Sequence, residues 1–211
     1  SSMANDLNLN KHIKISETYR LDTIKNLADE SIVMHCKHFN HFLMTGEIDD
    51  KITDILDTIS TSHFNLFKFN AKVGRQMTLP LIFYYVLFGS CQNYFEEIRK
   101  PKLKSFITEI YKGYKRDVTY HNDLHGSDLV QVLGVWLNNS NISRQMQFKE
   151  IDIFSIITAA AIHDFKHPGT NNTFQINMST DIALTFNDNS VLESYHVSEA
   201  FKVLKKHENN F

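Results

Sequence analysis

Hydrophobic residues recur at helical spacing over long parts of this chain. They do so in Ser16–Leu43, in Asp49–Ile59 and in Ser190–Lys206, where apolar side chains fall three, four and seven positions apart. Residues at these spacings share one face of an α-helix, whereas the apolar positions of a half-buried strand alternate with a period of two. The pattern therefore predicts an amphipathic helix in each of the three ranges.

Three other ranges are predicted to be helices, and the last two of them are apolar enough to be buried on most sides. The first begins at Thr78-Leu79-Pro80, where a hydroxyl near the cap and a proline in the first turn mark a helix entry, and it runs to about Ile98. The other two are Leu124–Leu137 and Glu150–Ile162. Pro168-Gly169 then forces a break in the chain.

Turn-forming residues are scarce, which also favours helices over strands. The 211 residues include 7 Gly and 3 Pro, no stretch alternates with a period of two, and a further helix is predicted over 101–111. The chain is long enough for one domain, and its 16 Phe and 8 Tyr suit a packed interior. The sequence thus predicts an all-α fold, a compact multi-helix bundle.

The start of the chain is predicted to lie outside this domain. Ser1-Ser2-Met3 resembles a tag remnant before a starting methionine, and residues 1–15 are polar and rich in Asn. We therefore expect a tag remnant and flexible lead-in at 1–15, followed by the domain at 16–211.

Charge, hydropathy and cysteine content narrow the class of protein. The 22 Lys and Arg nearly balance the 24 Asp and Glu, so there is no reason to expect a nucleic-acid surface. The most apolar run, Leu79–Phe88, is about half the length of a transmembrane helix, so no transmembrane segment is expected. Cys36 and Cys91 stand apart without metal or redox spacing, which is typical of buried apolar residues. We expect an intracellular, cytoplasmic protein.

Two clusters of histidine and aspartate accompany the buried helices. His121 and His125 lie four residues apart, so a helix places both on one face, and Asp128 follows three residues later. His163 and Asp164 come directly after an apolar helix. Burying an imidazole beside a carboxylate is costly unless both are satisfied, and a metal ion satisfies both. These nitrogen and oxygen donors suit zinc or a zinc–magnesium pair.

Three ordered blocks of residues carry a resemblance to a known family. In chain order the blocks are Tyr120-His121-Asn122-x-x-His125-x-x-Asp128, His163-Asp164-x-x-His167-Pro168-Gly169-x-x-Asn172 and Asn187-Asp188-x-Ser190-Val191-Leu192-Glu193-x-x-His196. With these blocks the chain resembles the catalytic domain of class I 3′,5′-cyclic nucleotide phosphodiesterases, from about Ile48 to its last residue. The resemblance implies the all-helical fold of that family, in agreement with the helical pattern.

The resemblance also implies a metal centre. The zinc ligands would be His125, His163 and Asp164. Asp164 would also bridge to a second divalent ion, Mg²⁺ or Mn²⁺, whose water molecules would contact His167 and Glu193. Further support for the site would come from Asp128, Asn172 and His196.

The activity implied is hydrolysis of cAMP, cGMP or both to the 5′-nucleoside monophosphate, in signal transduction. Two ions would neutralise the phosphodiester and lower the pKa of a bridging water, so that hydroxide attacks the phosphorus. His121 would be the general acid that protonates the departing 3′ oxygen, because a histidine titrates near neutrality. Tyr120 would lie at the wall of the substrate pocket.

Parts of the family pattern are missing or altered. A fourth zinc ligand, an aspartate, and the glutamine and phenylalanine that bind the purine belong to a part of the domain that would follow Phe211, so we expect a C-terminally incomplete domain. The fragment alone is expected to be weakly active or inactive. Gly126-Ser127 stand in place of two alanines, which is expected only to loosen the helix slightly.

Other interpretations of these residues remain open. The domain could be another His-Asp-type metal phosphohydrolase, or a non-catalytic cyclic-nucleotide-sensing domain. Ordinary surface or helix positions are the alternative for Asp128, Glu193 and His196. Outside the family pattern, a polar helix face is expected at His35, His38 and His41, and core at Phe64-x-x-Phe67-x-Phe69.

Overall fold

The computed structural model describes residues 54–211, apart from the side chains of Glu96 and Lys100. Every regular element in this range is a helix, which confirms the predicted all-α fold. The helices are α4 Leu66–Val73, α5 Arg75–Ser90, α6 Gln92–Glu97, α7 Lys100–Gly113, α8 Asp123–Asn139, α9 Ile142–Gln145, α10 Glu150–Ile162, α11 Asn172–Asn177, α12 Asp181–Thr185 and α13 Val191–Leu204.

Several predictions for the first part of the chain lie outside the described residues. They concern the lead-in at 1–15, the helix at Ser16–Leu43 and the three histidines within it. Of the helix predicted at Asp49–Ile59, residues 54–56 are helical and turns follow. The predictions for α7, α8, α10 and α13 are confirmed to within a few residues.

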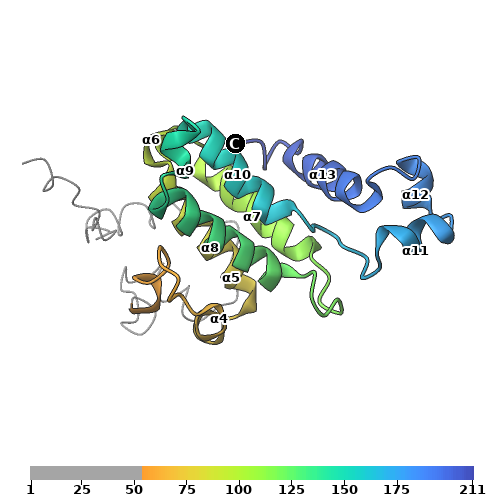
Figure 1. The fold of residues 1–211 in the computed structure, drawn as a ribbon, viewed down its shortest axis with the longest axis horizontal. Helices are drawn as coiled ribbons and strands as arrows, with labels where there is room; N and C mark the ends of the chain where they lie inside the picture. The colour runs from red at the N-terminus through yellow and green to blue at the C-terminus, as the bar shows by residue number, and fades with distance from the viewer. Residues whose placement is uncertain (1–53) are drawn as a thin grey trace, which may run out of the picture.

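The helices form two parts (Figure 1). The long helices α5, α7, α8 and α10 lie side by side in a bundle, with α4, α6 and α9 around it. At one end α11 and α12 stand apart from the bundle, and α13 leads back from them to pack on α7 and α10. The chain that connects the two parts is the segment after α10, where the second polar cluster of the sequence lies.

The helix α5 is the centre of the bundle. Its buried residues run almost without interruption from Met77 to Leu87, because α4, α7, α8 and α10 pack around it. Burial of one such side chain, for example Phe83, contributes about 1.5–3 kcal/mol. A Cβ at Gly134 of α8 would lie 2.5 Å from Val86 Cγ1, so a side chain there would push α5 and α8 apart. No helix of the described range, α5 included, has the length and hydropathy to span a membrane.

The helix predicted over 78–98 is wrong in its limits. α5 begins earlier, at Arg75, and ends at Ser90. Cys91 then leaves the helical region, with φ −147° and ψ 58°, so α6 is a separate helix. Pro80 consequently lies in the second turn of α5 rather than in the first.

The aromatic cluster before α5 is core only in part. Phe69 is fully buried and Phe64 packs partly against the core, but Phe67 is 73% exposed, so the prediction is wrong for Phe67. The buried residues of α4 are Leu66, Phe69 and Val73, which lie three and four positions apart on one face. Phe67 falls outside this face and turns to solvent.

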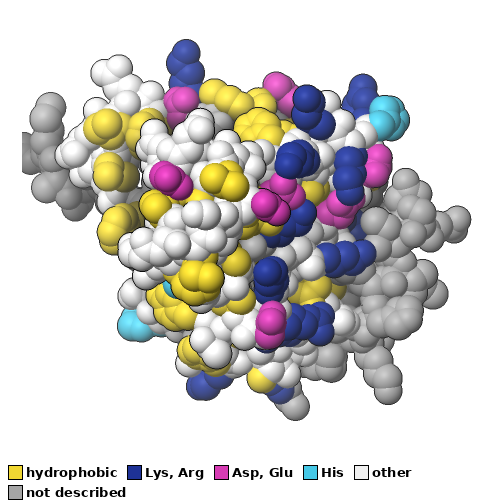
Figure 2. Space-filling view, turned by 90° about the vertical axis from the view of Figure 1, so that its right-hand side faces the viewer, with side chains coloured by type: hydrophobic (Ala, Val, Ile, Leu, Met, Phe, Trp, Pro, Cys, Tyr) yellow, Lys and Arg dark blue, Asp and Glu magenta, His cyan; other side chains and the backbone are white. Residues whose placement is uncertain are grey.

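The end of the molecule with α11, α12 and α13 exposes both apolar and charged side chains. Figure 2 shows hydrophobic side chains spread over one half of this face, and charged side chains gathered on the other. Two ion pairs bind α13 to its neighbours. Lys166, after α10, lies 2.6 Å from Glu199, and Lys206 lies 2.5 Å from Glu109 of α7.

Candidate metal centre

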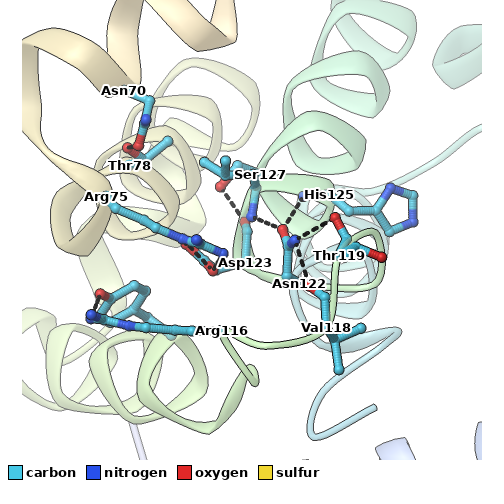
Figure 3. A network of polar contacts seen from close by, with 12 residues as sticks. Asn70, Arg75, Thr78, Arg116, Val118, Thr119, Asn122, Asp123, His125 and Ser127 are labelled. Carbon is cyan, nitrogen blue, oxygen red and sulfur yellow. Dashed lines mark hydrogen bonds and ion pairs between the residues drawn. The ribbon is translucent and has the colours of Figure 1, made fainter. Parts of the chain in front are cut away.

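The first turn of α8 is fixed by Asn122, its N-cap. The side-chain Oδ1 of Asn122 accepts hydrogen bonds from the backbone N–H groups of Leu124 at 3.0 Å and of His125 at 3.4 Å (Figure 3). Its Nδ2 donates to the carbonyls of Val118 at 3.0 Å and Thr119 at 3.2 Å. One buried amide therefore ties the preceding loop to the helix that carries His125.

The other side of the centre is the end of α10 and the loop behind it. Lys166 has a φ of 61°, a left-handed conformation that is uncommon for a residue with a side chain. The turn sends Phe165 into the core and returns the chain to the site at His167. Such backbone strain is typical of functional sites, where the surrounding structure holds it in place.

Three ligand atoms converge where α8 meets the end of α10. His125 Nε2 lies 3.1 Å from His163 Nε2 and 3.4 Å from Asp164 Oδ2, and the last two atoms lie 3.0 Å apart. A tetrahedral zinc ion with Zn–N bonds of about 2.0–2.1 Å separates its ligand atoms by about 3.3 Å. The structure thus brings together the three predicted zinc ligands, at spacings that fit this ion.

The orientation of His163 suits a cation as well. His163 Nδ1–H donates to the carbonyl of Ala160 at 2.8 Å, so the ring has its lone pair on Nε2 when it is neutral. Nε2 of His163 lies 3.1 Å from Nε2 of His125, so a cation between these two atoms would be bound by both rings. The donor set and its orientation therefore fit a metal ion.

The pKa values in this cluster show how strongly its members interact. The pKa of His125 lies below its ordinary value, first because of burial and then because of His163. Burial raises the pKa of Asp164, but the hydrogen bond with His163 and the charges of the surrounding histidines together outweigh burial, and the net effect lowers the pKa. Burial lowers the pKa of His163, but the hydrogen bonds with Asp164 and Ala160 and the charge of Asp164 together raise it above its ordinary value. The cluster thus favours an ionised carboxylate beside a neutral His125.

A second group of possible ligand atoms adjoins the first. It comprises Asp164, His167 and His196, whose ligand atoms lie within 4.8 Å of one another. Nδ1 of His167 accepts a hydrogen bond from the N–H of Gly169 at 3.0 Å, so the neutral ring carries its proton on Nε2. Burial and the charge of His121 lower the pKa of His167 to about 4, which favours that neutral form at pH 7.

His196 completes this second group from α13. Its side chain is buried, and Nδ1–H donates to the carbonyl of Phe165 at 2.7 Å. Its Nε2 therefore faces Asp164, 3.8 Å from Oδ1. Its ring is roughly parallel to that of His167, with 5.4 Å between the centroids.

Two proteins with similar sequences are both named as phosphodiesterases of cyclic nucleotides. Over 160 residues, 74% of this chain, the sequence is 34% identical to the dual specificity calcium/calmodulin-dependent 3′,5′-cyclic nucleotide phosphodiesterase 1C of Mus musculus. Over 131 residues, 61% of this chain, it is 37% identical to the 3′,5′-cyclic-AMP phosphodiesterase 4 of Dictyostelium discoideum. The chain spans only 22% and 12% of the length of these two relatives.

A family model decides the relationship for the part of the chain that carries the metal centre. The model of the 3′5′-cyclic nucleotide phosphodiesterase family matches residues 120–211. Residues 120–211 belong to this family. The match contains both groups of ligand atoms, and it agrees with the resemblance seen in the three sequence blocks.

In this phosphodiesterase segment, His121 lies beside the metal ligands. Its ring stacks on His167 with 4.1 Å between centroids and meets the ring of His125 edge-on at 5.9 Å. Within residues 54–211, the groups of side chains able to hold a metal do not include His121. Tyr120 is 63% exposed, and its ring lies 4.6 Å from that of His125 at the outer edge of the site.

The remaining predicted residues of the phosphodiesterase segment lie further out. Asn172 Nδ2 donates to Glu193 Oε2 at 3.0 Å, and its Oδ1 accepts the N–H of Leu192 at 2.9 Å, so Asn172 joins the starts of α11 and α13. The pKa of Glu193 is lowered, first by a hydrogen bond with the backbone N–H of Glu193 itself and then by the hydrogen bond from Asn172. Asp128 is exposed on α8, and its charge favours the protonated form of His125, which raises the pKa of that ring.

Three residues outside the predicted set also shape the site, namely Asn122, Asp123 and Arg75. Asn122 was recognisable as an N-cap, because it precedes a helix with an acidic residue in its first turn. Asp123 is buried and binds Arg75 of α5, which is 48 residues away in sequence (Figure 3). No local pattern indicates a pairing over that distance.

Gly126 matters more for helix packing than expected. A Cβ at this position would lie 3.1 Å from the hydroxyl oxygen of Tyr114, which donates a hydrogen bond to the carbonyl of Ala161 at 3.0 Å. Gly126 thus makes room for a bond that links the end of α7 to α10 past α8. Ser127 is fully buried and donates to the carbonyl of Asp123 at 2.6 Å. The expectation that this pair only loosens the helix is therefore incomplete.

Proposed function

We propose that the protein hydrolyses 3′,5′-cyclic nucleotides, cAMP, cGMP or both, to 5′-nucleoside monophosphates in signal transduction. The observation that carries the proposal is the convergence of ligand atoms from His125, His163 and Asp164 inside a segment that matches the phosphodiesterase family. One relative is named for cyclic AMP and another for dual specificity, so both nucleotides are candidate substrates. An intracellular, cytoplasmic setting is part of the proposal, and the free, buried Cys91 supports it.

The proposed metal centre has zinc on His125, His163 and Asp164, and Mg²⁺ or Mn²⁺ beside Asp164. When bound, the two cations would neutralise the anionic phosphodiester and lower the pKa of a bridging water toward neutrality. His167 suits a contact with water rather than with metal, because Gly169 occupies its Nδ1 and its Nε2 carries the proton.

His121 is the proposed general acid. The 3′ oxygen needs a proton as its bond to phosphorus breaks, and a histidine that titrates near neutrality is a suitable donor. The ring contacts with His167 and His125 hold His121 next to the ligand atoms but outside the ligand group. His121 can therefore give a proton to the departing 3′ oxygen of a cyclic nucleotide at the centre while the metal ligands stay in place.

The other residues have proposed supporting roles. Asn172 orients Glu193 toward the water shell of the second ion, a role that their direct hydrogen bonds support. His196 keeps Asp164 in place, and its own orientation is set by the carbonyl of Phe165. The exposed ring of Tyr120 forms part of the pocket wall, and Asp128 supports the site from α8, where its charge acts on the ring of His125.

The 211-residue chain by itself is proposed to be weakly active or inactive. The family pattern takes a further zinc ligand and the purine-binding side chains from a later part of the domain. The assay is turnover of cAMP and cGMP by the purified chain loaded with Zn²⁺ and Mg²⁺. A turnover number typical of enzymes, about 1–10³ s⁻¹, contradicts this part of the proposal.

The experiment that tests the mechanism compares His121→Ala with His125→Ala. Zinc content is measured by mass spectrometry in the 211-residue chain, and turnover in a protein with the whole catalytic domain. We expect His121→Ala to keep its zinc and to lower turnover by about 10²–10⁴-fold, whereas His125→Ala loses zinc. His207→Ala, at an exposed histidine beyond α13, is the matched control and should change neither. Loss of zinc from His121→Ala contradicts the general-acid role, and the absence of cyclic nucleotide turnover in the wild-type domain contradicts the function.

A further inference from the structure

A buried ion pair joins the first residues of two helices beside the metal centre. Arg75 begins α5 and Asp123 begins α8. Arg75 Nε donates to both carboxylate oxygens of Asp123 at 3.0 Å, and one of its terminal nitrogens donates to Oδ1 at 2.7 Å (Figure 3). The side chain of Asp123 is 1% exposed and that of Arg75 33% exposed. The carboxylate is thus almost completely removed from water, with a forked cation as its partner.

Asp123 lies in sequence between two residues that are central to the proposed site. His121 precedes it by two positions and His125 follows it by two. Its backbone carbonyl accepts the hydroxyl of the buried Ser127 at 2.6 Å, and the preceding Asn122 caps the helix. The carboxylate of Asp123 is therefore the point at which this rigid first turn is bound to another helix.

The charge of Asp123 suits its position at a helix N-terminus, whereas the charge of Arg75 does not. An anion at a helix N-terminus is stabilised by the backbone dipoles, and a cation there is destabilised. Asp123 stands at the favourable position on α8, while Arg75 stands at the unfavourable position on α5 and depends on its partner. Removing either side chain leaves the other charge unpaired, and for Asp123 that charge is buried, so the two form one unit.

The geometry of the pair adds a directional constraint that apolar packing does not provide. The side chains between α5 and α8 set the distance between the helix axes, but apolar contacts are non-directional and oppose a small slide along the axis only weakly. A forked guanidinium on a carboxylate is directional. A slide of α8 by about 1 Å would change the contact between His125 and His163, which now lie 3.1 Å apart at their Nε2 atoms.

We propose that Arg75 and Asp123 are positioning residues of the metal centre. The pair fixes the first turn of α8 against α5, and thereby holds His121 and His125 in register with the ligands at the end of α10. Its meaning for catalysis rests on the proposed function, whereas its effect on metal binding is measurable without turnover.

The test uses the 211-residue chain and separates positioning from stability. Asp123→Leu leaves Arg75 unpaired, whereas the double variant Arg75→Met/Asp123→Leu replaces both charges by apolar groups, which is often neutral for stability. We expect the single variant to lower the unfolding midpoint, and the double variant to recover most of it. Zinc affinity, measured by competition with a chelator, should fall about 10–100-fold in both, the range seen when groups that orient metal ligands are removed.

The control is a second ion pair, which joins the turn after α13 to α7. Lys206→Met/Glu109→Leu removes this pair, and zinc affinity should stay unchanged. Full recovery of zinc affinity in the Arg75→Met/Asp123→Leu variant overturns the proposal, because the pair would then act only on stability.

A milder variant keeps the test decisive if Asp123→Leu does not fold. Arg75→Lys keeps the charge and loses the fork, so zinc affinity should fall several-fold with little change in the unfolding midpoint. Unchanged affinity in Arg75→Lys overturns the proposal. A wild-type chain that binds zinc but hydrolyses no cyclic nucleotide in a complete domain would refute only the proposed function, since the affinities still decide the positioning role.

Discussion

The bundle and the segment of α11 and α12 are stabilised in different ways. α5 and α10 bury apolar side chains over most of their length. In α11 the buried residue is Gln175, and in α12 it is Ala183, while Phe174, Met178 and Leu184 are exposed on the same two helices. The bundle therefore depends on apolar burial, and the α11–α12 segment does not.

Side-chain hydrogen bonds take the place of a core in the α11–α12 segment. Gln175 Nε2 donates to the hydroxyl of Thr170 at 2.6 Å, and its Oε1 accepts the hydroxyl of Thr180 at 2.6 Å. Asn171 caps α11, and Thr180 caps α12. Asn172 adds the connection to α13. Each such bond contributes about 0.5–1.5 kcal/mol, so the segment should open more easily than the bundle.

The candidate site lies across the boundary between these two parts. The closest ligand atoms come from α8 and the end of α10, on the bundle side, while Asn172 and Glu193 lie on the other side. On this side, apolar packing sets the distance between the helices that carry the proposed zinc ligands, and the Arg75–Asp123 pair is proposed to fix their register. The residues proposed to contact water are attached to the less stable part, where small adjustments cost less.

The largest difference between the two parts is expected in the free energy of unfolding when a core aromatic residue is replaced. Phe83→Ala in α5, at a fully buried position, should lower the free energy of unfolding by about 3–5 kcal/mol, because it leaves a cavity in the bundle. Phe174→Ala in α11, where the ring is 47% exposed, is the matched control and should cost less than about 1 kcal/mol. Urea unfolding of the 211-residue chain measures both. Equal losses of unfolding free energy in the two variants would show that the two parts are not stabilised in different ways.

A smaller and more local effect is expected at Gln175. Gln175→Met keeps the volume but removes the bonds to Thr170 and Thr180, so local opening of α11 and α12 should become easier by about 1–3 kcal/mol. Hydrogen exchange read by mass spectrometry should speed up over residues 170–189 and stay unchanged in α5 and α8. Asn177→Ala, exposed on the same helix, is the control. Faster exchange throughout the bundle would show that the two parts unfold together.

The smallest effect is expected at the close contact between Gly126 and Tyr114. Alanine is favoured over glycine inside a helix by about 1 kcal/mol, but the new Cβ would lie 3.1 Å from the buried Tyr114 hydroxyl. Gly126→Ala should therefore bring no gain in stability by itself, and a gain of about 0.5–1 kcal/mol in a Tyr114→Phe background. Thermal unfolding of the four proteins gives the coupling. The same effect in both backgrounds would show that the bundle is less tightly packed here than the structure indicates.

Much of the fold and of the metal centre was predictable from local sequence. The helix α13 follows from apolar spacing, α8 and α10 from ranges that are apolar on most sides, and the break at Pro168-Gly169 from the chemistry of these two residues. The limits of α5 had local signals that the prediction missed, because Gly74, with a φ of 81°, directly precedes Arg75, and Gly89 lies two residues before the break at Cys91. Phe67 was misassigned for a different reason, since only the packing of α4 decides which face is buried.

The sequence by itself determined the helical class, the positions of the candidate ligands and the family of residues 120–211, because periodicity and short motifs are local properties of a chain. Only the tertiary structure decided how far apart the ligand atoms lie, which ring nitrogens carry protons, and that Arg75 meets Asp123. These features depend on contacts between helices far apart in sequence. Such contacts form only when burial of α5 brings the helices together, and no short pattern records them.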